Sequence, residues 1–490
     1  MAIRFSALEA DIRQAEVIDQ YKVGMATVYI TSDCRYLIQE PHLSREAYAI
    51  YSKLEDRMDT FLQSLGDIRT DPERMHELEG RIWKEAQKTR QADRVSDFFG
   101  VLKYFIMRNK AGYGLLDVLV NDDQVDEIFV EGRGIEVAVS HRRHQEFGLL
   151  ETNIVIGDVI GTSLLVSNLL RKIGKTVVTK PVTEGITDQK HRVTITYGNA
   201  IPANGPAITI SKFQAKSYSV TDLLRLGTIS RLEAAYLWML NDAGAFGLVA
   251  GDAGSGKTTM LNSIGTMSNP RWRVITIEDV RRLHIPHRHV LAFDVWPLDD
   301  HERLLQLVRA SRWMRPDLLM VDDVQEEEAR EVFRSAQNGH AVLASMNCHD
   351  IDSLLCRLGA DPIGIKPAMQ AILWYAVLMD RFRSPQGRYV RRIRSIMEFD
   401  PANCVPSRTD LFSGNAKAME GPESIEDLLR KSKLVRHAAE ILGVNPEADL
   451  QARIKLLDEC LEKNAGKVHD VFEILKKHYR PNRIRIADQK

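Results

Sequence analysis

The stretch GDAGSGKT at residues 251–258 has the residue types and spacing of a phosphate-binding loop, G-x-x-x-x-G-K-[ST]. The apolar run FGLVA at 246–250 precedes it and a helical pattern follows from residue 259. Glycines let successive backbone N–H groups face one anion, and the positive end of the following helix points at the same phosphates. A chance Gly-rich turn is the alternative, but the strand and helix that flank the motif favour a nucleotide site.

We expect a consecutive set of residues to bind the nucleotide: Gly251, Asp252, Ala253, Gly254, Ser255, Gly256, Lys257, Thr258 and Thr259. In a loop of this pattern the lysine reaches the β and γ phosphates and the hydroxyl residue ligates Mg²⁺. The sequence therefore predicts a catalytic role for Lys257 and a metal-binding role for Thr258.

Two acidic pairs follow strand-like runs downstream of this loop. Asp322 and Asp323 end the run LLMV at 318–321, as in a Walker B strand, and Glu278 and Asp279 end the run RVITI at 273–277. Carboxylates there serve the Mg²⁺ shell and the attacking water. We predict that Asp322 and Asp323 bind Mg²⁺, that Asp323 is catalytic, and that Glu278 activates water. The alternative for 322–323 is an acidic surface turn, because residues 326–328 are also glutamates and resemble a solvated helix start.

The bulk composition narrows the class of protein. The 490 residues contain 66 Lys and Arg against 67 Asp and Glu, so no overall field attracts nucleic acid. The five cysteines include no C-x-x-C pair, which argues against a disulfide framework or a zinc knuckle. The longest uncharged apolar stretch, 368–379, is too short for a bilayer and predicts a buried helix. The first residues show no signal-peptide core, so we expect a cytoplasmic protein that meets membranes only through partners.

Four blocks follow one another along the chain. Residues 1–110 are mainly helical, with patterns over 44–65 and 72–94 and one β-like run at 25–30. Residues 111–216 predict an α+β domain with short strands at 127–130, 135–140 and 191–197. Alternating apolar strands and amphipathic helices over 217–400 predict an α/β core with a parallel sheet, and 401–490 predict a helical region.

Together these motifs resemble a known family, the hexameric P-loop (RecA-like) ATPases of type II and type IV secretion, which drive pilus assembly and archaeal motility. Residues 251–259 correspond to the Walker A motif of that family, 274–279 to its Asp box, 315–323 to its Walker B motif and 339–345 to its His box. The stretches 36–41, 125–141, 219–244 and 453–479 are most similar to the archaeal branch, the pilus and archaellum motor ATPases. The cysteine-rich zinc insertion of bacterial type II ATPases is missing from the sequence.

The resemblance implies ATP and Mg²⁺ as cofactors and a homo-oligomer of six subunits. It also implies a polytopic membrane platform protein as partner, no nucleic acid, and a place at the inner face of the cell membrane. His340 corresponds to a catalytic contact to the γ-phosphate, although a hydrogen-bonded core histidine is the alternative. Arg192 corresponds to a nucleotide-contacting arginine, whereas Arg309, Arg312 and Arg315 at helical spacing more often form a solvated or interface row.

The chain departs from the family pattern at several sensitive positions. Asp322 and Asp323 replace a Gly-Glu pair, Gln325 replaces an arginine, Asn347 replaces the second histidine of the His box, and Arg282 replaces a glutamate. These departures leave two functions open: a motor ATPase, or a nucleotide-binding paralogue with weak or no hydrolysis that serves as a structural or regulatory ring component. A DNA-translocating ATPase is less favoured, because the chain has no positive excess.

Overall fold

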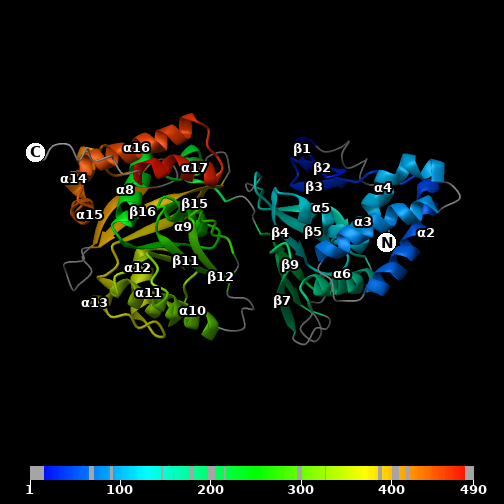
Figure 1. Ribbon diagram of the computed structural model, residues 1–490, viewed down its shortest axis with the longest axis horizontal. Helices are drawn as coiled ribbons and strands as arrows, with labels where there is room; N and C mark the ends of the chain where they lie inside the picture. Colours follow the sequence, from blue (N-terminus) through cyan, green and yellow to red (C-terminus); the bar gives the residue numbers. More distant parts are fainter. Residues whose placement is uncertain are drawn as a thin grey trace, which may run out of the picture. The chain divides into compact units, whose positions relative to one another are not determined.

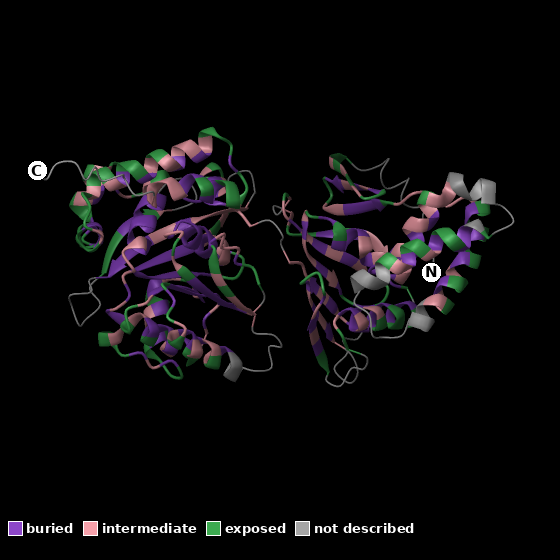
Figure 2. Cartoon of the chain, viewed as in Figure 1, coloured by how far each residue is buried: buried purple, intermediate pink, exposed green. Residues whose placement is uncertain are grey.

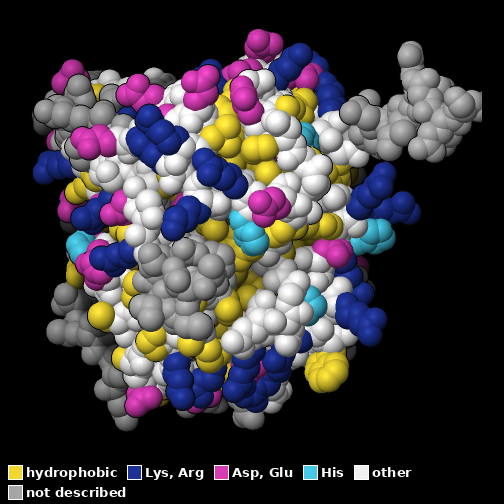
Figure 3. Space-filling view, turned by 90° about the vertical axis from the view of Figure 1, so that its left-hand side faces the viewer, with side chains coloured by type: hydrophobic (Ala, Val, Ile, Leu, Met, Phe, Trp, Pro, Cys, Tyr) yellow, Lys and Arg dark blue, Asp and Glu magenta, His cyan; other side chains and the backbone are white. Residues whose placement is uncertain are grey.

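The computed structural model describes residues 16–65, 71–88, 92–144, 147–157, 159–175, 181–196, 205–213, 217–279, 281–294, 301–325, 327–383, 389–399, 408–414 and 419–479. These residues form two compact units, Met1–Gln214 and Ala215–Lys490, each with its own nine-stranded sheet (Figure 1). Figure 2 shows that buried residues line the strands and the inward faces of the helices. Acidic and basic side chains are interspersed with apolar ones on the face in Figure 3, in line with the balanced composition.

The sheet of the first unit has the strand order β1-β2-β3-β6-β5-β4-β9-β8-β7. Its strands are β1 (Val17–Val23), β2 (Ala26–Thr31), β3 (Arg35–Gln39), β4 (Val125–Val130), β5 (Glu136–His141), β6 (Leu149–Val155), β7 (Val182–Ile186), β8 (Arg192–Thr196) and β9 (Ile208–Ser211). Alternate residues of β5 and β8 are buried, because successive side chains point to opposite faces of a sheet. One face of the sheet therefore supplies the core of this unit.

The helices of the first unit are α2 (Arg45–Leu65), α3 (Asp71–Gln87), α4 (Ala92–Lys110), α5 (Asp117–Asn121) and α6 (Val159–Lys172), with a 3₁₀ turn η1 (Gly114–Leu116). Helices α2, α3 and α4 bury a cluster of their own that includes Leu54, Leu78 and Ile106. The predicted helix over 72–94 includes residues 89–91, which lie outside the described residues.

The structure groups the first 216 residues differently from the predicted blocks. The predicted run at 25–30 is β2, and it is one of three strands that join the sheet of the α+β block, where β3 pairs in parallel with β6. Backbone N–H and C=O groups of a strand need partners, and β6 provides them. The first three strands therefore belong to the same sheet as the predicted α+β block, while α2, α3 and α4 make up most of the described part of 1–110.

The sheet of the second unit has the order β12-β11-β13-β14-β10-β15-β16-β17-β18. Its strands are β10 (Phe246–Gly251), β11 (Arg273–Glu278), β12 (His289–Asp294), β13 (Leu318–Val321), β14 (Ala341–Asn347), β15 (Tyr375–Arg383), β16 (Tyr389–Phe399), β17 (Arg408–Gly414) and β18 (Met419–Glu420). The strands from β12 to β15 are parallel, as predicted for the core, and those from β15 to β18 are antiparallel.

Helices cover both faces of this sheet. They are α7 (Val220–Arg225), α8 (Arg231–Asp242), α9 (Lys257–Thr266), α10 (His301–Trp313), α11 (Glu327–Gln337), α12 (Ile351–Gly359), α13 (Pro367–Gln370), α14 (Ile425–Lys431), α15 (Leu434–Leu442), α16 (Pro446–Glu462), α17 (Val468–Leu475) and the 3₁₀ turn η3 (Lys476–Tyr479). Helices α8, α9 and α14–α17 pack in one cluster, and α10–α12 pack in the other. No helix in the described part of the chain combines the length and apolar content that a membrane span requires.

One prediction of helix was wrong, and another holds for only part of its range. The apolar stretch 368–379 forms the short helix α13 and then β15, which is buried between β10 and β16. A strand with both faces covered is apolar throughout, so its sequence resembles that of a buried helix. Among the described residues of 401–490, β17 and β18 extend the core sheet, and the predicted helices follow from Ile425.

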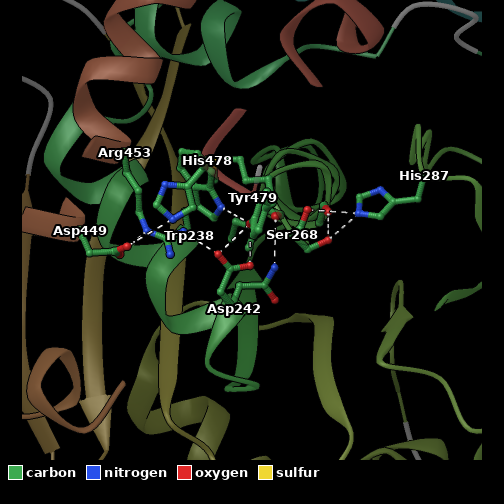
Figure 4. A network of polar contacts seen from close by, with 12 residues as sticks. Trp238, Asp242, Ser268, His287, Asp449, Arg453, His478 and Tyr479 are labelled. Atoms are coloured by element: carbon green, nitrogen blue, oxygen red, sulfur yellow. Dashed lines mark hydrogen bonds and ion pairs between the residues drawn. The ribbon is translucent and has the colours of Figure 1, made fainter. Parts of the chain in front are cut away.

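A buried network of polar contacts connects α16 and η3 to α8 (Figure 4). Arg453 of α16 is 2% exposed, donates to Asp242 at 2.6 Å and to Asp449 at 2.6 Å, and its guanidinium lies 4.7 Å from the Trp238 ring centroid. The Tyr479 hydroxyl donates to Asp242 at 2.7 Å and accepts from the Trp238 indole at 2.6 Å. Two carboxylates thus compensate a guanidinium that water does not reach.

We expect Asp242→Ala to lower the free energy of unfolding by about 3 kcal/mol or more, because it leaves the buried Arg453 guanidinium short of a counterion. Urea denaturation of the full chain measures this change. Asp458→Ala is the matched control: Asp458 also joins α16 to α8, through Arg231, but the two side chains are 42% and 56% exposed. The control should change stability by less than about 1 kcal/mol. Equal losses in the two variants would contradict this account.

Candidate nucleotide-binding site

The predicted phosphate-binding loop connects the end of β10 at Gly251 to the start of α9 at Lys257. Gly254 and Gly256 have positive φ angles of 76° and 100°, a region that favours glycine. A Cβ at Gly251 would lie 2.3 Å from the Met379 carbonyl oxygen of β15, so only glycine lets the two strands approach so closely. The conformation therefore requires the three glycines of the motif.

Two donors inside the loop converge on one carbonyl oxygen. The Lys257 ammonium donates to the Asp252 carbonyl at 2.9 Å, and the Ser255 backbone N–H donates to the same oxygen at 3.2 Å. In a loop of this kind, donors of these two types bind a phosphate oxygen of the nucleotide. Here the Asp252 carbonyl oxygen accepts both hydrogen bonds instead. Burial lowers the pKa of Lys257, while Asp323 and Asp322 act to raise it. The ammonium thus binds the loop and is stabilised by the charges of the two carboxylates that follow β13.

The Thr258 hydroxyl and the Asp322 carboxylate are in direct contact. Thr258 Oγ1 donates to Asp322 Oδ2 at 2.8 Å. On the other side, Ser345 of β14 donates to Asp322 Oδ1 at 2.5 Å and accepts from the Asp323 backbone N–H at 2.8 Å. A hydroxyl oxygen and a carboxylate oxygen side by side are ligands that Mg²⁺ takes in phosphate sites. The structure thus brings together the two predicted metal ligands Thr258 and Asp322.

Asp323, the third predicted metal ligand, makes different contacts. Its Oδ1 accepts from the Asn347 side-chain amide at 2.5 Å, and its Oδ2 from Gln325 at 3.4 Å. Its φ of 53° is unusual for a residue other than glycine. Asn347 and Gln325 are two of the positions that depart from the family pattern, and here both bind the shortened carboxylate.

Glu278, the predicted base, ends β11 next to Asp322. Ile277 pairs with Val321, and Glu278 with Asp294 of β12. Glu278 is 1% exposed, and its Oε1 accepts from two backbone N–H groups at 2.9 Å and 2.8 Å. Its Oε2 has no hydrogen-bond partner among the described residues. Burial raises the pKa of this carboxyl to about 8, and Asp322 and Asp294 act in the same direction.

The structure does not bring His340 to the loop. His340 precedes β14, whereas the other end of β14, at Asn347, pairs with Gly251. Seven strand residues span about 20 Å. His340 Nδ1 is hydrogen-bonded instead to the Pro316 carbonyl at 3.0 Å. The predicted catalytic role of His340 is therefore wrong for the phosphate-binding loop of its own chain. The alternative, a hydrogen-bonded histidine at the start of a strand, describes its contact with Pro316.

The predicted arginines lie apart from the loop or in the other unit. Arg309 and Arg312 of α10 form ion pairs with the buried Glu331 of α11, at 3.2 Å and 3.0 Å. Arg192 belongs to β8 of the first unit, where it pairs with Glu184 at 3.2 Å. Its contact with nucleotide remains a prediction. The acidic run at 326–328 is only partly described, since Glu326 lies outside the described residues, but Glu328 is buried rather than solvated.

Two contacts in the site were missed from the sequence. Ser345 holds Asp322, and its place near the end of a buried strand beside β13 was the available signal. Arg391 of β16 donates to the Gly254 carbonyl of the loop. No local pattern indicated it, because 137 residues separate the two partners.

Glu278→Gln tests the buried carboxyl without requiring turnover. The folded protein holds the Glu278 proton up to about pH 8, whereas the unfolded chain releases it near the ordinary pKa of 4.5. Between these two pKa values, raising the pH favours the unfolded state, because only the unfolded chain releases the proton. The free energy of unfolding of the wild type therefore falls by up to about 1.4 kcal/mol per pH unit relative to that of the glutamine variant. Urea denaturation of both proteins at pH 5.5, 7 and 8.5 measures the difference. Parallel stability curves would contradict the raised pKa.

The family model for type II/IV secretion system proteins matches residues 123–421, more than half of the chain. MJ0900 of Methanocaldococcus jannaschii is 30% identical over 301 residues, 61% of this chain and 54% of that protein. The chain thus spans about half the length of this relative. The type IV secretion system protein PtlH of Bordetella pertussis is 33% identical over 119 residues, 23% of this chain and 35% of PtlH.

Among solved structures, the pilus retraction motor PilT with bound ADP has 15% identity and a TM-score of 0.41, with 74% of this chain and 96% of that chain covered. The family match is sufficient: this chain belongs to the type II/IV secretion system protein family, and its similarity to the M. jannaschii protein supports the archaeal branch.

Proposed function

We propose that this chain is an ATP-hydrolysing motor subunit, working in a ring of six copies, that powers a type IV pilus-like or archaellum-like filament or secretion. The observation that carries the proposal is the contact of Thr258 with Asp322 at 2.8 Å, at the start of the helix that follows the phosphate-binding loop. A structural Gly-rich turn has no need of a carboxylate at this point. Magnesium-dependent phosphoryl transfer requires one there.

The described residues divide the proposed chemistry among themselves. Lys257 and the loop amides bind and orient the phosphates, and Thr258 and Asp322 hold Mg²⁺, which when bound neutralises charge on the phosphate oxygens. We assign the role of base to Glu278 in its ionised form: its Oε2, which has no hydrogen-bond partner among the described residues, would take the proton of the attacking water. Because burial raises the pKa of this carboxyl to about 8, only the ionised fraction of Glu278 acts as the base near neutral pH. Arg192 of the first unit is proposed as a further nucleotide contact.

We place the motor in the cytoplasm, peripheral to the inner face of the cell membrane, with a polytopic membrane platform protein as partner and no nucleic acid. Membership in the type II/IV secretion family supports this placement. One named relative, PtlH, is a type IV secretion system protein.

A second function, a nucleotide-binding ring component with weak or no hydrolysis, is favoured by one observation. Asp323, in place of the family's glutamate, is hydrogen-bonded to Asn347 and Gln325. One missing methylene withdraws a carboxylate by roughly 1.5 Å, and a displacement of that size can cost about a hundredfold in rate. The same protein would then bind ATP and Mg²⁺ but turn over slowly.

Lys257→Ala should reduce ATP hydrolysis to background and weaken ATP binding at least about tenfold, because it removes the charge aimed at the β and γ phosphates. Steady-state phosphate release and equilibrium binding measure both effects. Lys463→Ala, which removes an exposed lysine from the end of α16, is the control and should match the wild type. Unchanged turnover in Lys257→Ala would contradict the assignment of the loop at 251–258 as the ATP site.

Asn substitutions of the two neighbouring aspartates separate the two functions. Asp322→Asn should lower kcat by about a hundredfold, because Asp322 is the carboxylate in contact with Thr258. Asp323→Asn should lower kcat by less than about threefold, because Asp323 makes its contacts with Asn347 and Gln325.

A larger loss of kcat in Asp323→Asn than in Asp322→Asn would assign the metal-binding role to Asp323. A gain of turnover in Asp323→Glu would show that the short side chain of Asp323 limits the rate. If ATP binds with Mg²⁺ but wild-type turnover is negligible and neither Asn variant changes it, the second function replaces the motor.

A further inference from the structure

Arg391 of β16 lies along the phosphate-binding loop. Its Nε donates to the Gly254 carbonyl oxygen at 2.7 Å. Its Cδ lies 3.5 Å from the position that a Cβ would take on Gly256. The side chain therefore contacts two of the three glycines whose conformation defines the loop.

The antiparallel extension of the sheet brings Arg391 to this place. β15 lies beside β10, where Met379 pairs with Gly251, and β16 then runs back along β15, where Arg391 pairs with Arg381. Met379 also contacts the loop, since its carbonyl excludes a side chain at Gly251. The hairpin of β15 and β16 thus forms a wall beside the loop.

The hydrogen bond from Arg391 fixes the orientation of one peptide group. In a planar trans peptide the C=O of Gly254 and the N–H of Ser255 point in opposite directions. Holding the carbonyl toward β16 keeps the Ser255 N–H on the far side, where it donates to the Asp252 carbonyl. Lys257 donates to that same oxygen. Arg391 therefore sets the direction of a loop donor that converges with the catalytic lysine.

The hydrogen bond, more than the charge, carries this effect. Arg391 is half-buried and its bond to Gly254 is solvent-exposed, so water and salt screen the field of the guanidinium. The direction of a peptide group is not screened in this way. A donor at the position of Nε is thus the feature that the loop requires.

On the nucleotide site proposed above, we propose that Arg391 is a positioning residue of the phosphate-binding loop, which acts on the phosphates through the Gly254 peptide. Nucleotide affinity then depends on a residue of β16, outside the loop and outside the strands that carry the acidic residues. The ligand class is the polyphosphate part of a nucleotide, not its base.

Two substitutions separate the hydrogen bond from the charge. Arg391→Gln places an amide nitrogen at the same position along the side chain as Nε but removes the charge. Arg391→Lys keeps the charge but places a methylene there. We expect Arg391→Lys to weaken Mg·ADP and inorganic pyrophosphate binding by about tenfold, and Arg391→Gln by about twofold or less. Isothermal titration at 50 and 300 mM salt measures both.

The same two substitutions at Arg394 are the matched control. Arg394 is on the same strand, is 40% exposed and pairs with Asp380 at 3.6 Å. Both Arg394 variants should bind like the wild type. Thermal unfolding without ligand should be unchanged in all four variants, which separates a loop effect from a general loss of stability.

Each other outcome overturns the proposal in a recognisable way. Weak, salt-dependent binding by Arg391→Gln with normal binding by Arg391→Lys would assign a charge effect. Equal binding by all variants would assign no role to Arg391 and would leave the proposed function intact. A wild type that binds neither ligand would remove the proposed function itself, whatever the variants do.

Discussion

The hydrogen bond from Thr258 to Asp322 is the contact on which the rest of the site depends, because it joins the first turn of α9 to the end of β13. Both ends are set by backbone geometry: α9 starts at the loop, and Asp322 follows a strand paired in parallel with β14. Ser345 of β14 completes the arrangement from the other side of the carboxylate. Carboxyl ends of parallel strands share one edge of a sheet, so a single register brings the acidic groups to the edge where the phosphate-binding loop lies.

Burial gives the neighbouring carboxyl its chemistry. Glu278 lies between the ends of β13 and β12, and removal from water raises its pKa to about 8. The backbone N–H groups of Arg282 and Leu283 stabilise one oxygen and oppose that shift, while the second oxygen has no partner among the described residues. A buried carboxyl with an unpaired oxygen lowers the free energy of unfolding at any pH at which it is ionised. Such a cost is typical of functional sites, and it accords with the proposed role of Glu278 as the base.

Sequence reasoning predicted the parts of this unit that local patterns determine. The loop, β11, β13 and the position of Asp322 followed from a motif, two apolar runs and the rule for parallel strands. The stretch 368–379 did not, because a strand covered on both faces has no alternation that would distinguish it from a buried helix. The prediction for His340 was wrong for a related reason. The pattern located β14 but did not show that His340 lies at the end of β14 opposite to the end that pairs with Gly251. Contacts across the sheet, such as Arg391 with Gly254, leave no local pattern at all.

The helix of the phosphate-binding loop is held near both of its ends by distant parts of the chain. Before its first turn, Arg391 of β16 holds the Gly254 carbonyl. After its last, the Tyr479 hydroxyl, which donates to Asp242 of α8, lies 2.9 Å from the Met267 carbonyl oxygen. A helix of ten residues is a stiff rod about 15 Å long, so it moves as a unit. On the proposed function, a shift of the loop during turnover would therefore reach Met267 and its contact with Tyr479. Tyr479 and Arg453 both bind Asp242 of α8, so the C-terminal helices are the distant element that such a shift would meet.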